Sequence, residues 1–259
     1  MYSRTALGLP LMFRLAAAAC GGSKPAEAPA TTAPAAAIDP ATAASIMGKV
    51  TLDGTAPANA RIRMNADPYC QTANSTPQTQ ETYVVSATGE IANVFVYISE
   101  GLGDRTFETP TTPVVLDQKN CHYNPHVLGL MVGQPLQILN SDGTLHNIHA
   151  IPMNNAEFNT GQPIKGMKTD HVFTAAETMV PFKCDVHGWM NAYAGVLPHP
   201  YFAVTGEDGT FSIKNLPPGS YKLTAWHEKL GTQTADLTVA EKDEKENNFT
   251  FKAAAASGN

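Results

Sequence analysis

Residues 206–231, "GEDGTFSIKNLPPGSYKLTAWHEKLG", decide how the fold of this chain is interpreted. Glu207-Asp208-Gly209 separates two β-branched and aromatic runs and is typical of a hairpin turn. Pro217-Pro218-Gly219 marks a second turn before the run at 221–226. Short runs of this composition, each bounded by turn residues, predict strands. This stretch therefore indicates antiparallel β structure.

Similar runs of β-branched and aromatic residues, bounded by turn residues, occur through much of the chain. They are found in "GKVTLDGTAP" (48–57), "ETYVVSATGE" (81–90), "IANVFVYIS" (91–99) and "TADLTVAEKDEKENNFTFK" (234–252). Outside the first 20 residues, no stretch shows a sustained helical period. We therefore expect an all-β protein.

Charge and composition exclude one class of partner. The chain of 259 residues has 17 Lys and Arg against 23 Asp and Glu, a net charge of −6. It has no basic block that could follow a phosphate backbone, so nucleic acid is excluded as a partner. A hydrophobic content of 43% is ordinary for a folded protein.

The first 45 residues are expected to serve export and attachment. Residues 1–20 combine two arginines with a short apolar stretch that ends in "AAAACGG", which resembles a bacterial lipoprotein signal. This predicts lipidation of Cys20 and a membrane-anchored protein in the periplasm; the alternative is a plain signal peptide cut nearby. Residues 21–45 are mostly Ala, Pro and Thr and are expected to form a disordered linker.

Two short stretches contain residues suited to a metal site. "FKCDVHGWM" (182–190) holds Cys184, His187 and Met190 within seven positions, and "LHNIH" (145–149) lies upstream. A thiolate, two imidazoles and a weak thioether are the ligands that a copper ion alternating between Cu(I) and Cu(II) favours. Zinc prefers four stronger ligands, so structural zinc fits less well. A core thiol with nearby histidines is the alternative without metal.

His146 and His149 compete for one place in such a site. Residues of opposite parity in an extended chain point to opposite faces, so both cannot readily face one ion. Trp189, which lies within the stretch 182–190, is interpreted as a packing residue rather than as part of a docking surface.

The two ends of the β region resemble the carboxypeptidase regulatory-like domain, a small transthyretin-like sandwich. "GKVTLDGTAPANARI" (48–62) is similar to its first strand and turn, and residues 206–231 to its later D-G-x-F … L-P-P-G-x-Y pattern. Neither piece is long enough for a whole sandwich. The resemblance implies one discontinuous sandwich, 46–107 plus 199–252, with a second domain inserted at 108–198. Two sandwiches in tandem are the alternative.

Residues 108–198 resemble the cupredoxin family, particularly its amicyanin-like and plastocyanin-like members. The likeness rests on "GQPLQILNSD" (133–142), on His-Asn-x-His and on the Cys-x2-His-x2-Met spacing. It implies a Greek-key β-sandwich with one copper ion per chain. The implied copper ligands are His146, Cys184, His187 and Met190. Asn147 is implied to support these ligands without binding the metal.

The remaining cysteines are then available to pair. With Cys20 assigned to lipidation and Cys184 to copper, Cys70 and Cys121 are left in an exported protein, where a disulfide is expected. Two free thiols are the alternative.

The resemblance implies a one-electron carrier with a type 1 copper centre. Electrons are expected to pass through an exposed edge of His187, to or from a c-type cytochrome or a periplasmic dehydrogenase, with no small-molecule substrate. We expect no enzymatic activity, because the His-x-His and His-Cys-His patterns of copper enzymes are absent. The alternatives are a copper-handling lipoprotein without electron transfer and a structural surface module with a vestigial site.

Overall fold

The computed structural model describes residues 39–253, and within this range the fold is all-β with one short helix. The all-β prediction is confirmed. The predicted signal, Cys20 and most of the predicted linker lie outside the described residues. Within 39–253, no helix has the length and apolar character needed to cross a membrane.

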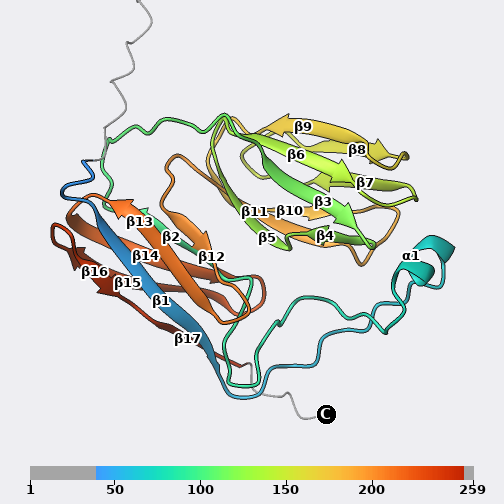
Figure 1. Cartoon of the computed structure of the whole chain (residues 1–259), viewed down its shortest axis with the longest axis horizontal. Coiled ribbons are helices and arrows are strands. Elements are labelled where there is room, and N and C mark those ends of the chain that lie inside the picture. The colour runs from blue at the N-terminus through green and yellow to red at the C-terminus, as the bar shows by residue number, and fades with distance from the viewer. Residues whose placement is uncertain (1–38, 254–259) are drawn as a thin grey trace, which may run out of the picture. The chain divides into compact units, whose positions relative to one another are not determined.

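Two sheets, which together we call the first sandwich, are built from strands near both ends of the described range (Figure 1). One sheet contains β13 (Thr210–Leu216), β1 (Ala44–Asp53), β16 (Glu244–Glu246) and β17 (Phe249–Lys252). The other contains, in order, β12 (Phe202–Val204), β2 (Phe95–Glu100), β14 (Gly219–His227) and β15 (Gly231–Val239). Strand β1 is antiparallel to β13 and parallel to both β16 and β17. Their buried side chains form one core.

Two further sheets, the second sandwich, come from strands between residues 114 and 197. One contains, in order, β5 (Val127–Met131), β11 (Asn191–Leu197), β10 (Glu177–Lys183), β7 (His146–Ala150) and β8 (Phe158–Gln162). The other contains, in order, β4 (His122–Asn124), β3 (Val114–Lys119), β6 (Pro135–Asn140) and β9 (Lys168–Val172). Pairs β5–β11 and β3–β6 are parallel, and the others are antiparallel.

Alternating burial explains why these segments are strands. In β6 every second residue, Leu136, Ile138 and Asn140, is buried, and the residues between them are half-buried. This period of two places one face of the strand against the core.

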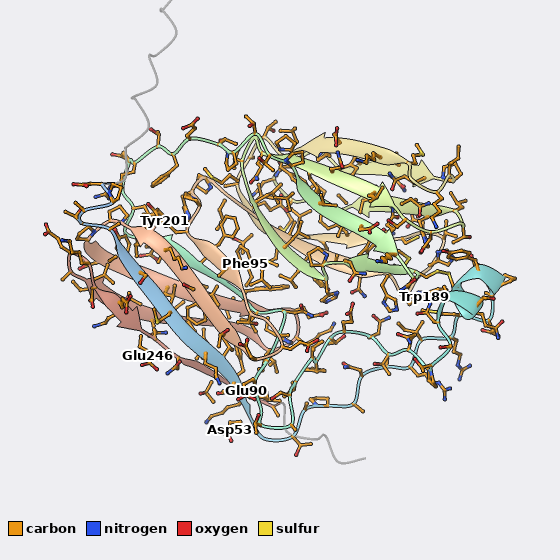
Figure 2. All side chains as sticks on the ribbon, in the orientation of Figure 1. Asp53, Glu90, Phe95, Trp189, Tyr201 and Glu246 are labelled. Carbon is orange, nitrogen blue, oxygen red and sulfur yellow. A yellow bond between two sulfur atoms is a disulfide. The ribbon has the colours of Figure 1, made fainter. Side chains whose placement is uncertain are left out.

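The two sandwiches contact each other around Phe95 of β2, which Figure 2 labels. A Cβ atom added to Gly195 of β11 would lie 2.3 Å from the Phe95 ring, and one added to Gly129 of β5 would lie 2.7 Å from it. Only glycine therefore leaves room for this ring against β5 and β11.

The connection from β1 to β2 reaches the second sandwich (Figure 1). It includes the helix α1 (Pro68–Ala73) and places Ile62, Met64 and Cys70 in the core of the second sandwich, although sequence reasoning assigned 46–107 to the first. Sequence reasoning also missed α1. The available signal was Asp67-Pro68, because Asp at the N-cap and Pro in the first turn favour a helix start.

Candidate metal centre

A short loop between β10 and β11 carries three of the four predicted ligands. Lys183 and Asn191 pair across the antiparallel strands and close its base. Inside that pair, the amide of Cys184 donates to the carbonyl of Met190 over 3.2 Å, and the amide of Met190 donates to the carbonyl of His187 over 2.9 Å. The loop is therefore a tightly closed hairpin that fixes where each side chain points.

The fourth predicted ligand, His146, is the first residue of β7. Strand β7 pairs with the end of β10 through Lys183 and His149, so His146 lies beside the loop. The Nδ1 atoms of His146 and His187 are 2.9 Å apart, and Cys184 Sγ lies 4.0 Å from His187 Nδ1. All three side chains are buried, and these donor atoms lie within 4.8 Å of one another.

The outer nitrogen of each imidazole faces a carboxylate. His146 Nε2 is 2.9 Å from Oδ2 of Asp142, and His187 Nε2 is 2.9 Å from Oδ2 of Asp67. A carboxylate accepts hydrogen bonds, so each Nε2 carries a proton. In a neutral ring this leaves the lone pair on Nδ1, and two Nδ1 atoms 2.9 Å apart are satisfied by a proton or a metal ion between them.

The charge around this point fits a metal cation. Burial raises the pKa of Cys184, but interactions with the side chains of His146 and His187 and with the His187 amide lower it to about 6. Burial also raises the pKa of Asp67, but hydrogen bonds from Thr144 and His187 and from the amides of the first turn of α1 lower it to about 2. Near neutral pH both groups are therefore negative.

Asp142 behaves in the same way. Burial raises its pKa, but hydrogen bonds from His146 and from the amides of Cys121 and Asn120 lower it below its usual value. Burial lowers the pKa of His146, but its contacts with Asp142 and Cys184 outweigh burial and raise this pKa above its usual value. A thiolate and two carboxylates thus surround two imidazoles in a buried place, which favours an added cation.

Distances test whether one ion could bind these donors. Zn²⁺ is similar in size to a copper ion, and its bonds to nitrogen and sulfur are about 2.0–2.3 Å long. Two donors on one such ion therefore lie no more than about 4.1–4.4 Å apart. The separations of 2.9 Å and 4.0 Å satisfy this limit. Two nitrogen donors and a thiolate match the ligand preference of copper.

Asn147 connects the two ligand segments. Its Oδ1 lies 3.2 Å from Cys184 Sγ and accepts the amide of Asp185 over 2.7 Å. Its carbonyl accepts the hydroxyl of Tyr123, which also donates to the carbonyl of Lys183. Asn147 therefore ties β7 to the loop that carries Cys184.

Three other candidate residues, Met190, His149 and Trp189, differ in their surroundings. Met190 is 1% exposed and lies in the second core with Cys184. His149 points elsewhere, with its nitrogens 2.9 Å from Asp185 and 2.7 Å from Glu157. Trp189 packs against the second core, its ring centroid 4.9 Å from that of His187.

Cys70 and Cys121 form a disulfide, with Cα atoms 5.6 Å apart. Cys184 is the free cysteine of the described range. The disulfide joins α1 to the turn between β3 and β4, and Cys70 Sγ lies 3.6 Å from His187 Nε2. Sequence reasoning did not foresee that the disulfide would lie against a candidate ligand.

The expectation of an exposed His187 edge is wrong. His187 is 2% exposed, because Asp67 and Cys70 cover its Nε2 side. Asp67 was missed because it lies 120 residues away in sequence, and no local pattern connects the two. Asp142 could have been found from its place four residues before His146.

Comparison with known proteins identifies one domain family. Residues 196–252 match the family model of the carboxypeptidase regulatory-like domain, which confirms the resemblance for the second of the two sequence pieces. No curated protein matches the chain.

The solved structures that match part of this chain include cupredoxins. An amicyanin mutant is 23% identical over 34% of this chain and 86% of its own, with a TM-score of 0.30. A purple cupredoxin from Nitrosopumilus maritimus is 24% identical over 33% of this chain and 98% of its own, with a TM-score of 0.28. A copper-containing nitrite reductase from Thermus scotoductus is 21% identical over 34% of this chain, with a TM-score of 0.32; the match spans 23% of the reductase.

The expectation that the chain has no enzymatic activity is overturned by the last of these matches. The nitrite reductase is an enzyme by its name, and the match spans 23% of it. The expectation of no enzymatic activity is therefore withdrawn.

Proposed function

We propose that this chain is a type 1 copper protein that carries single electrons, with one copper ion held by His146, Cys184, His187 and Met190. One observation carries the proposal. The buried Nδ1 atoms of His146 and His187 and the buried sulfur of Cys184 converge on one point, while the outer nitrogens of both imidazoles face carboxylates. A bound copper ion supplies exchange of one electron between Cu(I) and Cu(II).

The residues of the chain keep the donors in place for both oxidation states. The loop is closed by its own backbone hydrogen bonds, and Asn147 ties it to β7. The His187 amide donates to Cys184 Sγ over 3.3 Å, which stabilises the thiolate. Because these contacts fix the ligands before a metal binds, little rearrangement accompanies a change of charge.

The proposal extends to the setting of the protein. We infer an exported lipoprotein, anchored through Cys20, in which residues 108–198 form a cupredoxin domain inserted between 46–107 and 199–252. A disulfide in the described range supports an oxidising compartment. A c-type cytochrome or a periplasmic dehydrogenase is the class of redox partner that we propose.

The burial of His187 favours a second candidate, a copper-handling protein without electron transfer. With both imidazole edges covered, an external donor lacks the short path that an exposed ligand provides. Such a protein would hold Cu(I) and would not exchange electrons readily.

Voltammetry of the copper-loaded protein tests the proposal. A carrier should give a reversible one-electron couple, and oxidised protein should be reduced rapidly by a small c-type cytochrome. Stable binding of Cu(I) without a reversible couple would support the copper-handling candidate and contradict the carrier.

A further inference from the structure

The side of His187 that faces away from the other ligands is occupied by the chain itself. Its Nε2 lies 2.9 Å from Asp67 Oδ2, and its side chain is 3% exposed. Asp67 comes from the connection between β1 and β2 and not from the strands that carry the ligands. A distant segment therefore supplies the hydrogen-bond partner of a candidate ligand.

The two oxygens of Asp67 have separate tasks. Oδ1 accepts the amides of Tyr69 and Cys70 over 2.7 and 3.2 Å and so caps the start of α1. Oδ2 accepts the hydroxyl of Thr144 over 2.8 Å and faces His187 Nε2. The cap fixes the carboxylate, and the fixed carboxylate orients the imidazole.

Several contacts hold α1 in this position. Cys70 is bonded to Cys121, and Tyr69 donates its hydroxyl to Asp142 over 3.2 Å. At the other end of the helix, Asn74 donates to the carbonyls of Cys70 and Asn120, each over 2.9 Å. Asp67 is thus placed by a segment that the second sandwich holds at both ends.

We propose that Asp67 is a positioning residue for the metal centre. It keeps the proton of His187 on Nε2, directs the Nδ1 lone pair toward Cys184 and His146, and makes the imidazole a stronger donor. This inference rests on the proposed function, because the group that His187 would bind is copper. A stronger donor with a nearby negative charge favours Cu(II) over Cu(I) and therefore lowers the reduction potential.

The test compares the variants Asp67→Asn and Asp67→Ser with the parent, each as purified protein loaded with copper. Asn and Ser both cap helices well, so α1 should keep its start, while neither supplies a carboxylate to His187. We expect copper(II) affinity to fall about 10–100-fold, as is typical when a partner of a metal ligand is removed. If only the affinity for Cu(II) falls, each tenfold loss of that affinity raises the reduction potential by about 59 mV.

A control variant separates positioning from other effects. Asp208→Asn removes a carboxylate that also accepts a backbone amide and a threonine hydroxyl, but in the hairpin turn of the first sandwich. It should keep the potential of the parent. Equal potentials and affinities in the Asp67 variants and in Asp208→Asn would overturn the inference.

A measurement on copper-free protein keeps this inference separate from the proposed function. Nitrogen-15 NMR of the parent should show His187 protonated at Nε2, with slow exchange of that proton, and Asp67→Ser should lose the slow exchange. A parent that carries the His187 proton on Nδ1 alone overturns the positioning role even if copper binds. A parent that shows this signal but gives no copper–thiolate absorption contradicts the proposed function instead.

Discussion

At the scale of single residues, the state of Cys184 determines what the site can bind. Only a thiolate is a good metal ligand, and this buried thiol has a pKa lowered to about 6, from an ordinary value of 9.0, by the histidines and the His187 amide. Because the folded pKa lies below the ordinary value, deprotonation stabilises the fold above pH 9. That contribution is lost as the pH falls through about 6.

We predict that copper-free protein shows this titration directly. Thiolate absorption near 240 nm should rise with a midpoint close to pH 6, and Cys184→Ser should lack the transition, since Cys70 and Cys121 are bonded to each other. A midpoint near pH 9 would mean that the histidines do not stabilise the thiolate.

Met190 is the weakest of the proposed ligands. Met190→Leu should retain copper and raise the reduction potential, because loss of a weak axial donor favours Cu(I). The swap conserves volume, so stability should change by less than about 1.5 kcal/mol. Voltammetry measures the shift, with Met131→Leu, another buried methionine, as the control. Loss of copper binding in Met190→Leu would show that the thioether is more than a weak axial ligand.

At the scale of elements, α1 and its disulfide attach the long β1–β2 connection to the second sandwich. The bond closes a span of 51 residues, and removing such a bond typically costs about 2–5 kcal/mol. We predict a loss of this size for the double variant Cys70→Ser with Cys121→Ser, measured by denaturant unfolding of copper-free protein. An unchanged midpoint and slope would show that the other contacts of α1 suffice to hold it.

The elements also show how far sequence reasoning reaches. Hairpin turns such as Glu207-Asp208-Gly209, and the spacing of Cys184 and His187, are local patterns, and they were enough to predict β structure and to bring these two side chains together. The covering of His187 could not be predicted, because it depends on a contact across 120 residues. The helix over Pro68–Ala73 is too short to show a period and was visible only through its cap.

At the scale of the whole molecule, the two sandwiches contact each other where Phe95 packs on two glycines. Gly195→Ala would place a Cβ atom 2.3 Å from the ring, and such overpacking typically costs about 1–3 kcal/mol. Gly161→Ala in β8, where a Cβ atom meets nothing within 4 Å, is the matched control. Denaturant unfolding should show a clear loss for Gly195→Ala and little change for Gly161→Ala. Equal values would mean that the Phe95 ring moves freely.

Whether Cys184 binds copper is tested most directly by visible absorption and electron paramagnetic resonance after one equivalent of Cu(II) is added to the purified protein. We predict an intense copper–thiolate band and the narrow copper hyperfine splitting of a type 1 centre, both absent in Cys184→Ser. A parent without the thiolate band, or an unchanged spectrum in Cys184→Ser, would contradict this prediction.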